Sequence, residues 1–151
     1  MDGIIFSAIS LISIVTVLVV GDALYIGLWY YIVIPLVAYL LTLPFKPNKF
    51  FLTGVSLAIL LTYIPYFYHN LFAERPEGLL GLGHLFSLPG LAVAIVLLSL
   101  YLKAKTFSPI MLFTISFIGA LFGFLINQFI VCNTVMYCGS LIWPVGLLSI
   151  G

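Results

Sequence analysis

The amino-acid sequence carries very little charge. Four acidic and five basic residues make up 6% of its 151 residues, whereas 64% are hydrophobic. Soluble domains average about 25% charged and about 45–50% apolar residues, because their surface needs enough polar groups to stay dissolved. The composition therefore excludes an ordinary soluble domain. It predicts an all-α integral membrane protein that a lipid bilayer shelters from water.

The few charges do not gather into runs. A net charge of +1 excludes a nucleic-acid-binding footprint. No basic cluster of the kind that grips anionic lipid headgroups is visible either. The start, Met1-Asp2-Gly3, lacks the positive residues of a signal peptide, so the first apolar segment is expected to be a retained span. No transit peptide or Asn-x-Ser/Thr acceptor occurs, which favours a bacterial inner membrane.

Enzyme and cofactor motifs are also missing. The sequence has no HExxH, no GxSxG and no carboxylate pair on one helix face, so we predict no catalytic residue and no cofactor. The glycine-rich stretch Gly78-Leu-Leu-Gly81-Leu-Gly83 lacks the Lys-Ser/Thr and the preceding strand of a phosphate loop. A lipid-modifying enzyme that uses the His and Glu residues of the predicted outer loop 69–88 stays open as an alternative.

Apolar segments separated by polar or Gly/Pro breaks predict a polytopic transmembrane helical bundle in a single domain. The stretch 4–43 would be about 60 Å long as one helix, twice the hydrocarbon core, so it must fold back at Gly21-Asp22. Gly21 allows a positive φ there, and Asp22 is expected to cap the second helix. The expected spans are about five, at 4–20, 24–43, 50–68, 89–103 and 109–131, with an outer loop 69–88 and an outer tail 132–151.

Local signals place the ends of these spans. The segment 44–49, with two prolines and two lysines, is a firm break. Ser87 with Pro89, and Ser108 with Pro109, are typical of a helix cap and first turn. The aromatic residues after the first turn predict an interfacial belt; they are Tyr25, Trp29, Tyr30 and Tyr31.

The lysines predict the orientation. Four of them, Lys46, Lys49, Lys103 and Lys105, fall in the two connections that five spans place on one side. The positive-inside rule makes that side cytoplasmic, with a cytoplasmic N-terminus and an outer C-terminus. The predicted spans hold no ionisable group at depth, which counts against ion-coupled transport.

Cys132 and Cys138 then lie on the outer side, where disulfides form. Six residues apart on one helix they could not pair, so a bond requires the helix to end near Asn133. Such a small loop would gain about 2 kcal/mol. Two reduced thiols remain the alternative, and two cysteines alone do not complete a zinc site.

His69 and His84 bracket the predicted outer loop. We expect hydrogen-bonded histidines at the interface, and metal or haem ligation is only a weak alternative because the spacing matches no metal motif. The loop is also the longest connection, and its Glu74, Arg75 and Glu77 make it the expected contact surface, together with His84.

On the last span, Gly119 and Gly123 form a GxxxG pair. Packing within the chain is the simpler interpretation, and homodimerisation is the alternative. Asn127 and Gln128 lie near the outer end and are expected to hydrogen-bond across helices or to line a polar pocket.

These observations favour a non-enzymatic role in protein–protein interaction. The protein would stabilise a membrane complex as a subunit, or act as an immunity-type protein at the outer face, with the bilayer and another membrane or periplasmic protein as partners. A channel or carrier for a small neutral or lipidic solute is the alternative, since Pro35 and Pro65 could open helix carbonyls to a solute. A haem or redox protein is a further alternative.

Overall fold

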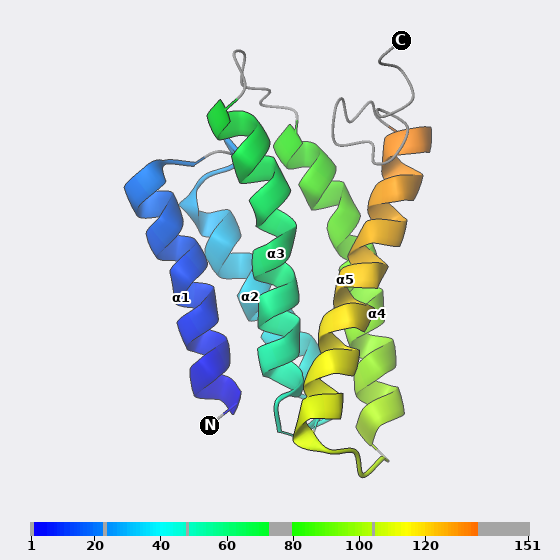
Figure 1. Cartoon of the computed structure of the whole chain (residues 1–151). Coiled ribbons are helices and arrows are strands. Elements are labelled where there is room, and N and C mark those ends of the chain that lie inside the picture. Colours follow the sequence, from blue (N-terminus) through cyan, green and yellow to red (C-terminus); the bar gives the residue numbers. More distant parts are fainter. Residues whose placement is uncertain (1, 23, 48, 73–79, 104, 136–151) are drawn as a thin grey trace.

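The computed structural model of the chain is an all-helical bundle. It describes residues 2–22, 24–47, 49–72, 80–103 and 105–135. Within these ranges there is no strand, and the predicted all-α class is confirmed. Five helices run alternately up and down (Figure 1): α1 (Asp2–Val20), α2 (Leu28–Thr42), α3 (Phe51–Phe72), α4 (Leu80–Lys103) and α5 (Pro109–Thr134).

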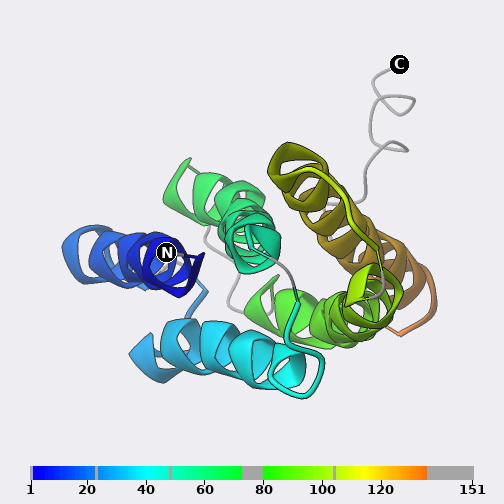
Figure 2. The same ribbon diagram turned by 90° about the horizontal axis from the view of Figure 1, so that it is seen from below.

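The helices are arranged in two layers. Seen along the bundle, α1, α3 and α5 form one layer and α2 and α4 form the other (Figure 2). The closest packing joins α4 to α5 and α3 to α5. Because α3 has neighbours on both sides and behind it, 56% of its most apolar 18-residue stretch is buried, against 17% for α1 at the edge.

Four of these helices are long and apolar enough to cross a membrane: α1, α3, α4 and α5. The remaining helix, α2, has 15 residues. At 1.5 Å per residue it is about 22 Å long, short of the roughly 30 Å hydrocarbon core. The described residues therefore contain four helices of spanning length rather than the five predicted, which agrees with a multi-helix membrane protein.

The predicted outer loop 69–88 is wrong at both ends. Helix α3 continues to Phe72, so His69 lies in this helix and not in the loop. The sequence placed residues 80–88 in an outer loop, but α4 begins at Leu80, so Ser87 and Pro89 lie inside the helix. The Ser87 hydroxyl donates to the Gly83 carbonyl, 2.7 Å away, instead of capping a helix. Proline is tolerated inside membrane helices because neighbouring groups satisfy the backbone that it frees. The same signature does begin α5, where Ser108 Oγ accepts from the Met111 backbone N–H.

The turn between α1 and α2 falls where the sequence predicts it. Gly21 has a φ of +99°, which a side chain would disfavour. The N-cap of α2, however, is Gly27 and not Asp22. The predicted aromatic belt is also only half right, because Tyr30 and Tyr31 are buried between the helices whereas Tyr25 and Trp29 are exposed.

Candidate functional site

The most polar part of the interior surrounds His84, which is completely buried in the second turn of α4. Tyr63 stacks on its ring at a centroid distance of 4.9 Å and an interplanar angle of 20°. Tyr66 meets the ring edge-on and Phe124 approaches it at a tilt, both at 4.9 Å. Three helices thus enclose one imidazole. We call His84, Tyr30, Thr62, Tyr63 and Tyr66 the His84 cluster.

Hydrogen bonds fix the tautomer of His84. Thr62 Oγ1 donates to the Ile59 carbonyl at 2.7 Å, so it accepts from His84 Nε2, 2.9 Å away. His84 Nδ1 then has a lone pair, which accepts from the Tyr30 hydroxyl at 2.6 Å. The imidazole is neutral in this arrangement, and it ties α2, α3 and α4 together.

A second group of polar contacts lies beside the cluster, at the turn between α1 and α2. The Asp22 carboxylate accepts hydrogen bonds from the backbone N–H groups of Leu24 (3.1 Å) and Gly27 (2.5 Å) and from the Tyr31 hydroxyl (2.8 Å). The Tyr31 ring in turn lies 5.1 Å from the Tyr63 ring. The carboxylate thus supplies partners inside the protein for two backbone N–H groups of the irregular turn.

A second carboxylate, that of Asp2, joins α1 to α3 at the opposite end of the bundle. Asp2, the first residue of α1, accepts hydrogen bonds from Leu52 N, Thr53 N and the Thr53 hydroxyl at the start of α3. The first N–H groups of a helix have no partner within it and carry positive partial charge, so a carboxylate stabilises them. No local sequence pattern predicts this contact, because Asp2 and Thr53 are 51 positions apart.

The geometry limits the chemistry of His84. Both ring nitrogens are engaged inside the protein, so a metal or haem iron could bind only after one of these bonds was broken. Across the part of the chain that the structure describes, no three His, Cys, Asp or Glu residues come together as metal ligands. The hydrogen-bonded chain ends at the Ile59 carbonyl, which cannot pass a proton on. The bonds described for the cluster link α2, α3 and α4 to one another.

The GxxxG pair is used inside the chain. A Cβ atom on Gly123 would lie 2.4 Å from the Ala94 Cβ, and one on Gly90 would lie 2.3 Å from the Gly123 carbonyl oxygen. Gly119 packs on Leu98 in the same way. Packing within the chain, the simpler prediction, is what the structure has, and α4 occupies this helix face.

The structure also describes several other residues that the sequence predicts to be functional. Asn127 Nδ2 donates to the Phe86 carbonyl at 2.7 Å, so it bonds across helices as expected. Gln128 is half-buried one residue later, and Cys132 is buried in the last turn of α5. His69 is half-buried near the end of α3. Glu74, Arg75, Glu77 and Cys138 lie outside the described residues, so the loop contact and the disulfide stay predictions.

The sequence contains one local pattern that predicts the α3 part of the His84 cluster. On α3, Thr62, Tyr63, Tyr66 and Asn70 fall at i, i+1, i+4 and i+8, which is one helix face, and all four are buried. A polar stripe along one face of an apolar span indicates a face turned toward other helices.

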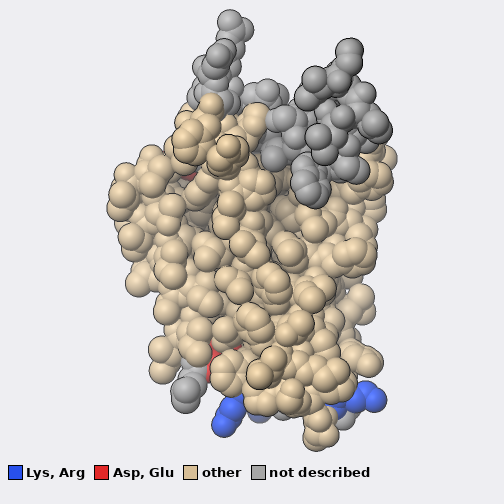
Figure 3. Space-filling model, in the orientation of Figure 1, with Lys and Arg blue, Asp and Glu red and all other residues tan. Residues whose placement is uncertain are grey.

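The lysines gather at one end of the bundle (Figure 3). This is the end at which α1 begins, α2 ends, α3 begins, α4 ends and α5 begins. Asp22 and the groups hydrogen-bonded to it lie at the other end of the bundle. Comparison of the chain with known protein families, with curated proteins and with solved structures found no match.

Proposed function

We propose that the protein is a non-enzymatic multi-pass membrane protein that binds another membrane or periplasmic protein, either as a stabilising subunit or as an immunity-type protein. One observation carries this proposal. The ionisable side chains Asp2, Asp22 and His84 each bond to a neighbouring segment of the chain. Their chemistry thus serves the fold, which favours a role in contact over a role in catalysis.

The proposal includes a topology. In it α2, extended by the Asp22 turn, makes the fifth pass, and the support for this is that the Asp22 carboxylate accepts from two backbone N–H groups of the turn, which lowers the cost of placing the turn in the membrane. The lysine end faces the cytoplasm of a bacterial inner membrane. The N-terminus is then cytoplasmic, and the end of α5 with its predicted Cys132–Cys138 disulfide faces outward.

The proposed partner contacts lie at the outer end. There α3 ends at Phe72 and α4 begins at Leu80, and the sequence that connects them carries Glu74, Arg75 and Glu77. These are the charges that the sequence places on that side besides Asp22, so they are the groups best suited to give a partner specificity. Gln128 lies on α5 near the same end.

The test is co-purification of the full chain, with an affinity tag, in a mild detergent after cross-linking in its native membrane. We expect a second protein in fixed stoichiometry. The variant Glu74→Lys/Glu77→Lys should lose it, and Lys49→Gln, at the other end, should retain it. A chain that runs as an isolated monomer after cross-linking would contradict the proposal.

A channel or carrier for a small neutral or lipidic solute remains the second candidate. It is favoured by Pro35 and Pro65, which lie inside α2 and α3. A proline removes one helix hydrogen bond and leaves a carbonyl oxygen able to accept from a solute. Solute uptake into vesicles that contain the purified protein would distinguish this candidate, because a partner-binding protein gives none.

A further inference from the structure

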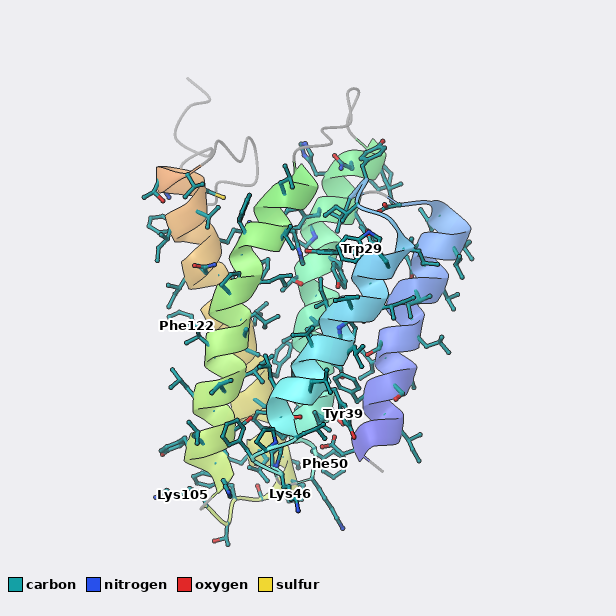
Figure 4. The ribbon with its side chains drawn as sticks, turned by 180° about the vertical axis from the view of Figure 1, so that it is seen from behind. Trp29, Tyr39, Lys46, Phe50, Lys105 and Phe122 are labelled. Atoms are coloured by element: carbon teal, nitrogen blue, oxygen red, sulfur yellow. The ribbon has the colours of Figure 1, made fainter. Side chains whose placement is uncertain are left out.

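An apolar groove runs along the outside of the bundle between α2 and α4. Twelve residues line it, and α2 contributes one face from Trp29 to Leu41 while α4 contributes one face from Leu85 to Ile95. The free volume is about 150 Å³. Tyr30, whose hydroxyl is bonded to His84, forms part of the wall. Figure 4 shows the two helices side by side, with Trp29 near the upper end of α2.

The dimensions of the groove fit a single hydrocarbon chain. From Trp29 to Leu41 is twelve residues, about 18 Å along a helix, which is close to the roughly 15 Å thickness of one leaflet. A free volume of about 150 Å³ suits a slender apolar group, since a closed apolar cavity of that size holds benzene.

Three lysines lie at the end of the bundle beyond one end of the groove. Lys46 follows the end of α2, Lys103 lies in the last turn of α4, and Lys105 is two residues further on. Lys46 and Lys105 project from the same end of the bundle, below α2 and α4 (Figure 4). Lys46 and Lys105 are far apart in sequence, so they form no basic run, and the fold brings them to the same end of the bundle, beyond Leu41 and Ile95, where the lining of the groove ends.

The acidic group described at this end, Asp2, is bonded on the far side of the bundle from Lys46 and Lys103. Asp2 is held by three hydrogen bonds at the start of α3. The helix α3 lies in the other layer of the bundle, away from the α2–α4 face (Figure 2). An anionic headgroup beside Lys46 and Lys103 would therefore meet a positive field.

We propose that the α2–α4 groove and Lys46, Lys103 and Lys105 form a binding site for one anionic phospholipid. Its phosphate lies among the lysines, and one acyl chain lies in the groove, from Leu41 toward Trp29. In the proposed topology this is the cytoplasmic leaflet, where a lysine near an anionic surface adds about fivefold to binding. The lipid would fill the space that the loosely packed α2 leaves beside α4.

Native mass spectrometry of the full chain in mild detergent tests the site, with phosphatidylglycerol, phosphatidylcholine and glycerol 3-phosphate as probes. We expect one phosphatidylglycerol to bind at least tenfold more tightly than phosphatidylcholine. Glycerol 3-phosphate, which has the phosphate without chains, should not compete. Replacing the three lysines by glutamine should lower phosphatidylglycerol affinity at least tenfold, and replacing them by arginine should preserve it.

The groove has its own variants. Ala92→Phe should fill it and lower phosphatidylglycerol affinity at least fivefold, with Leu85→Trp as a second filling variant. Ala8→Phe is the matched control, because Ala8 lines a different apolar hollow on α1. Equal binding of the two phospholipids, full binding by the glutamine variant, or equal effects of Ala92→Phe and Ala8→Phe would overturn the proposal. So would a dimer that Ala92→Phe breaks, since a second copy would then occupy the groove.

Discussion

Two buried tyrosine hydroxyls in the His84 cluster differ in their hydrogen bonding. The Tyr30 hydroxyl donates to His84 Nδ1, whereas the Tyr63 hydroxyl is buried with no hydrogen-bond partner among the described residues. Removing a bonded hydroxyl leaves the imidazole acceptor unsatisfied in an apolar interior, but removing an unbonded one relieves a desolvation penalty. The pair therefore separates hydrogen bonding from packing.

We predict that Tyr30→Phe lowers the free energy of unfolding by about 1 kcal/mol, in line with hydrogen bonds between membrane helices. Tyr63→Phe should change it by less than about 0.5 kcal/mol or raise it. Unfolding of the full chain in mixed micelles by titration with dodecyl sulfate measures both values. If Tyr63→Phe were the more damaging variant, the assigned roles of the two hydroxyls would be wrong.

Asp22 carries a larger share of stability, because three donors converge on it. Hydrogen bonds to a charged group contribute about 1.5–3 kcal/mol each, and the turn is only partly buried. Asp22→Ala should therefore lower the free energy of unfolding by about 2–4 kcal/mol in the same titration. Asp22→Asn keeps one acceptor oxygen and should lose about half as much. Equal stability of Asp22→Ala and the wild type would show that the turn holds without its carboxylate.

At the scale of the helices, the closest contact is between α4 and α5. We predict that Gly123→Leu lowers the free energy of unfolding by about 3 kcal/mol, because its side chain would meet the Gly90 carbonyl oxygen and the Ala94 side chain. Gly3→Ala on α1 is the control, since nothing lies within 4 Å of a Cβ there, and it should be neutral. The thermal midpoint in detergent compares the two variants.

The helices themselves could be predicted because their cause is local. Long apolar runs form helices in a bilayer whatever they pack against, and Gly21 and Ser108 marked two of their ends correctly. The start of α4 failed for a physical reason. Ser87 and Pro89 give the same pattern whether they begin a helix or lie inside one, and only the helices around them decide which.

The site was harder to predict, because its contacts are long-range. His84 bonds Tyr30, 54 residues away, and Asp2 bonds Thr53, 51 residues away. No spacing rule connects such pairs. With α4 assumed to begin at residue 89, His84 was placed in a loop, and the buried imidazole could not be foreseen. The polar stripe on α3 gives the one local indication of that interior.

At the scale of the whole molecule, the alternating helices place the two lysine-bearing turns at one end and the end of α5 at the other. The bundle therefore has two alternative orientations, with the lysine end facing either the cytoplasm or the outside. Because both lysine turns lie at one end, we expect them to face the same compartment, and the positive-inside rule predicts that this compartment is the cytoplasm, since translocating several lysines is unfavourable.

Single cysteines decide that choice in a Cys132→Ser/Cys138→Ser background. In intact cells we predict that a membrane-impermeant maleimide fails to label Lys46→Cys and Lys105→Cys, and that it labels Phe72→Cys, which is exposed at the far end of α3. Permeabilised cells should label all three, which controls for accessibility. Labelling of Lys46→Cys but not Lys105→Cys would contradict the alternating arrangement of the helices. Labelling of both, with Phe72→Cys protected, would reverse the proposed orientation, and the proposed outer partner contacts would then lie in the cytoplasm.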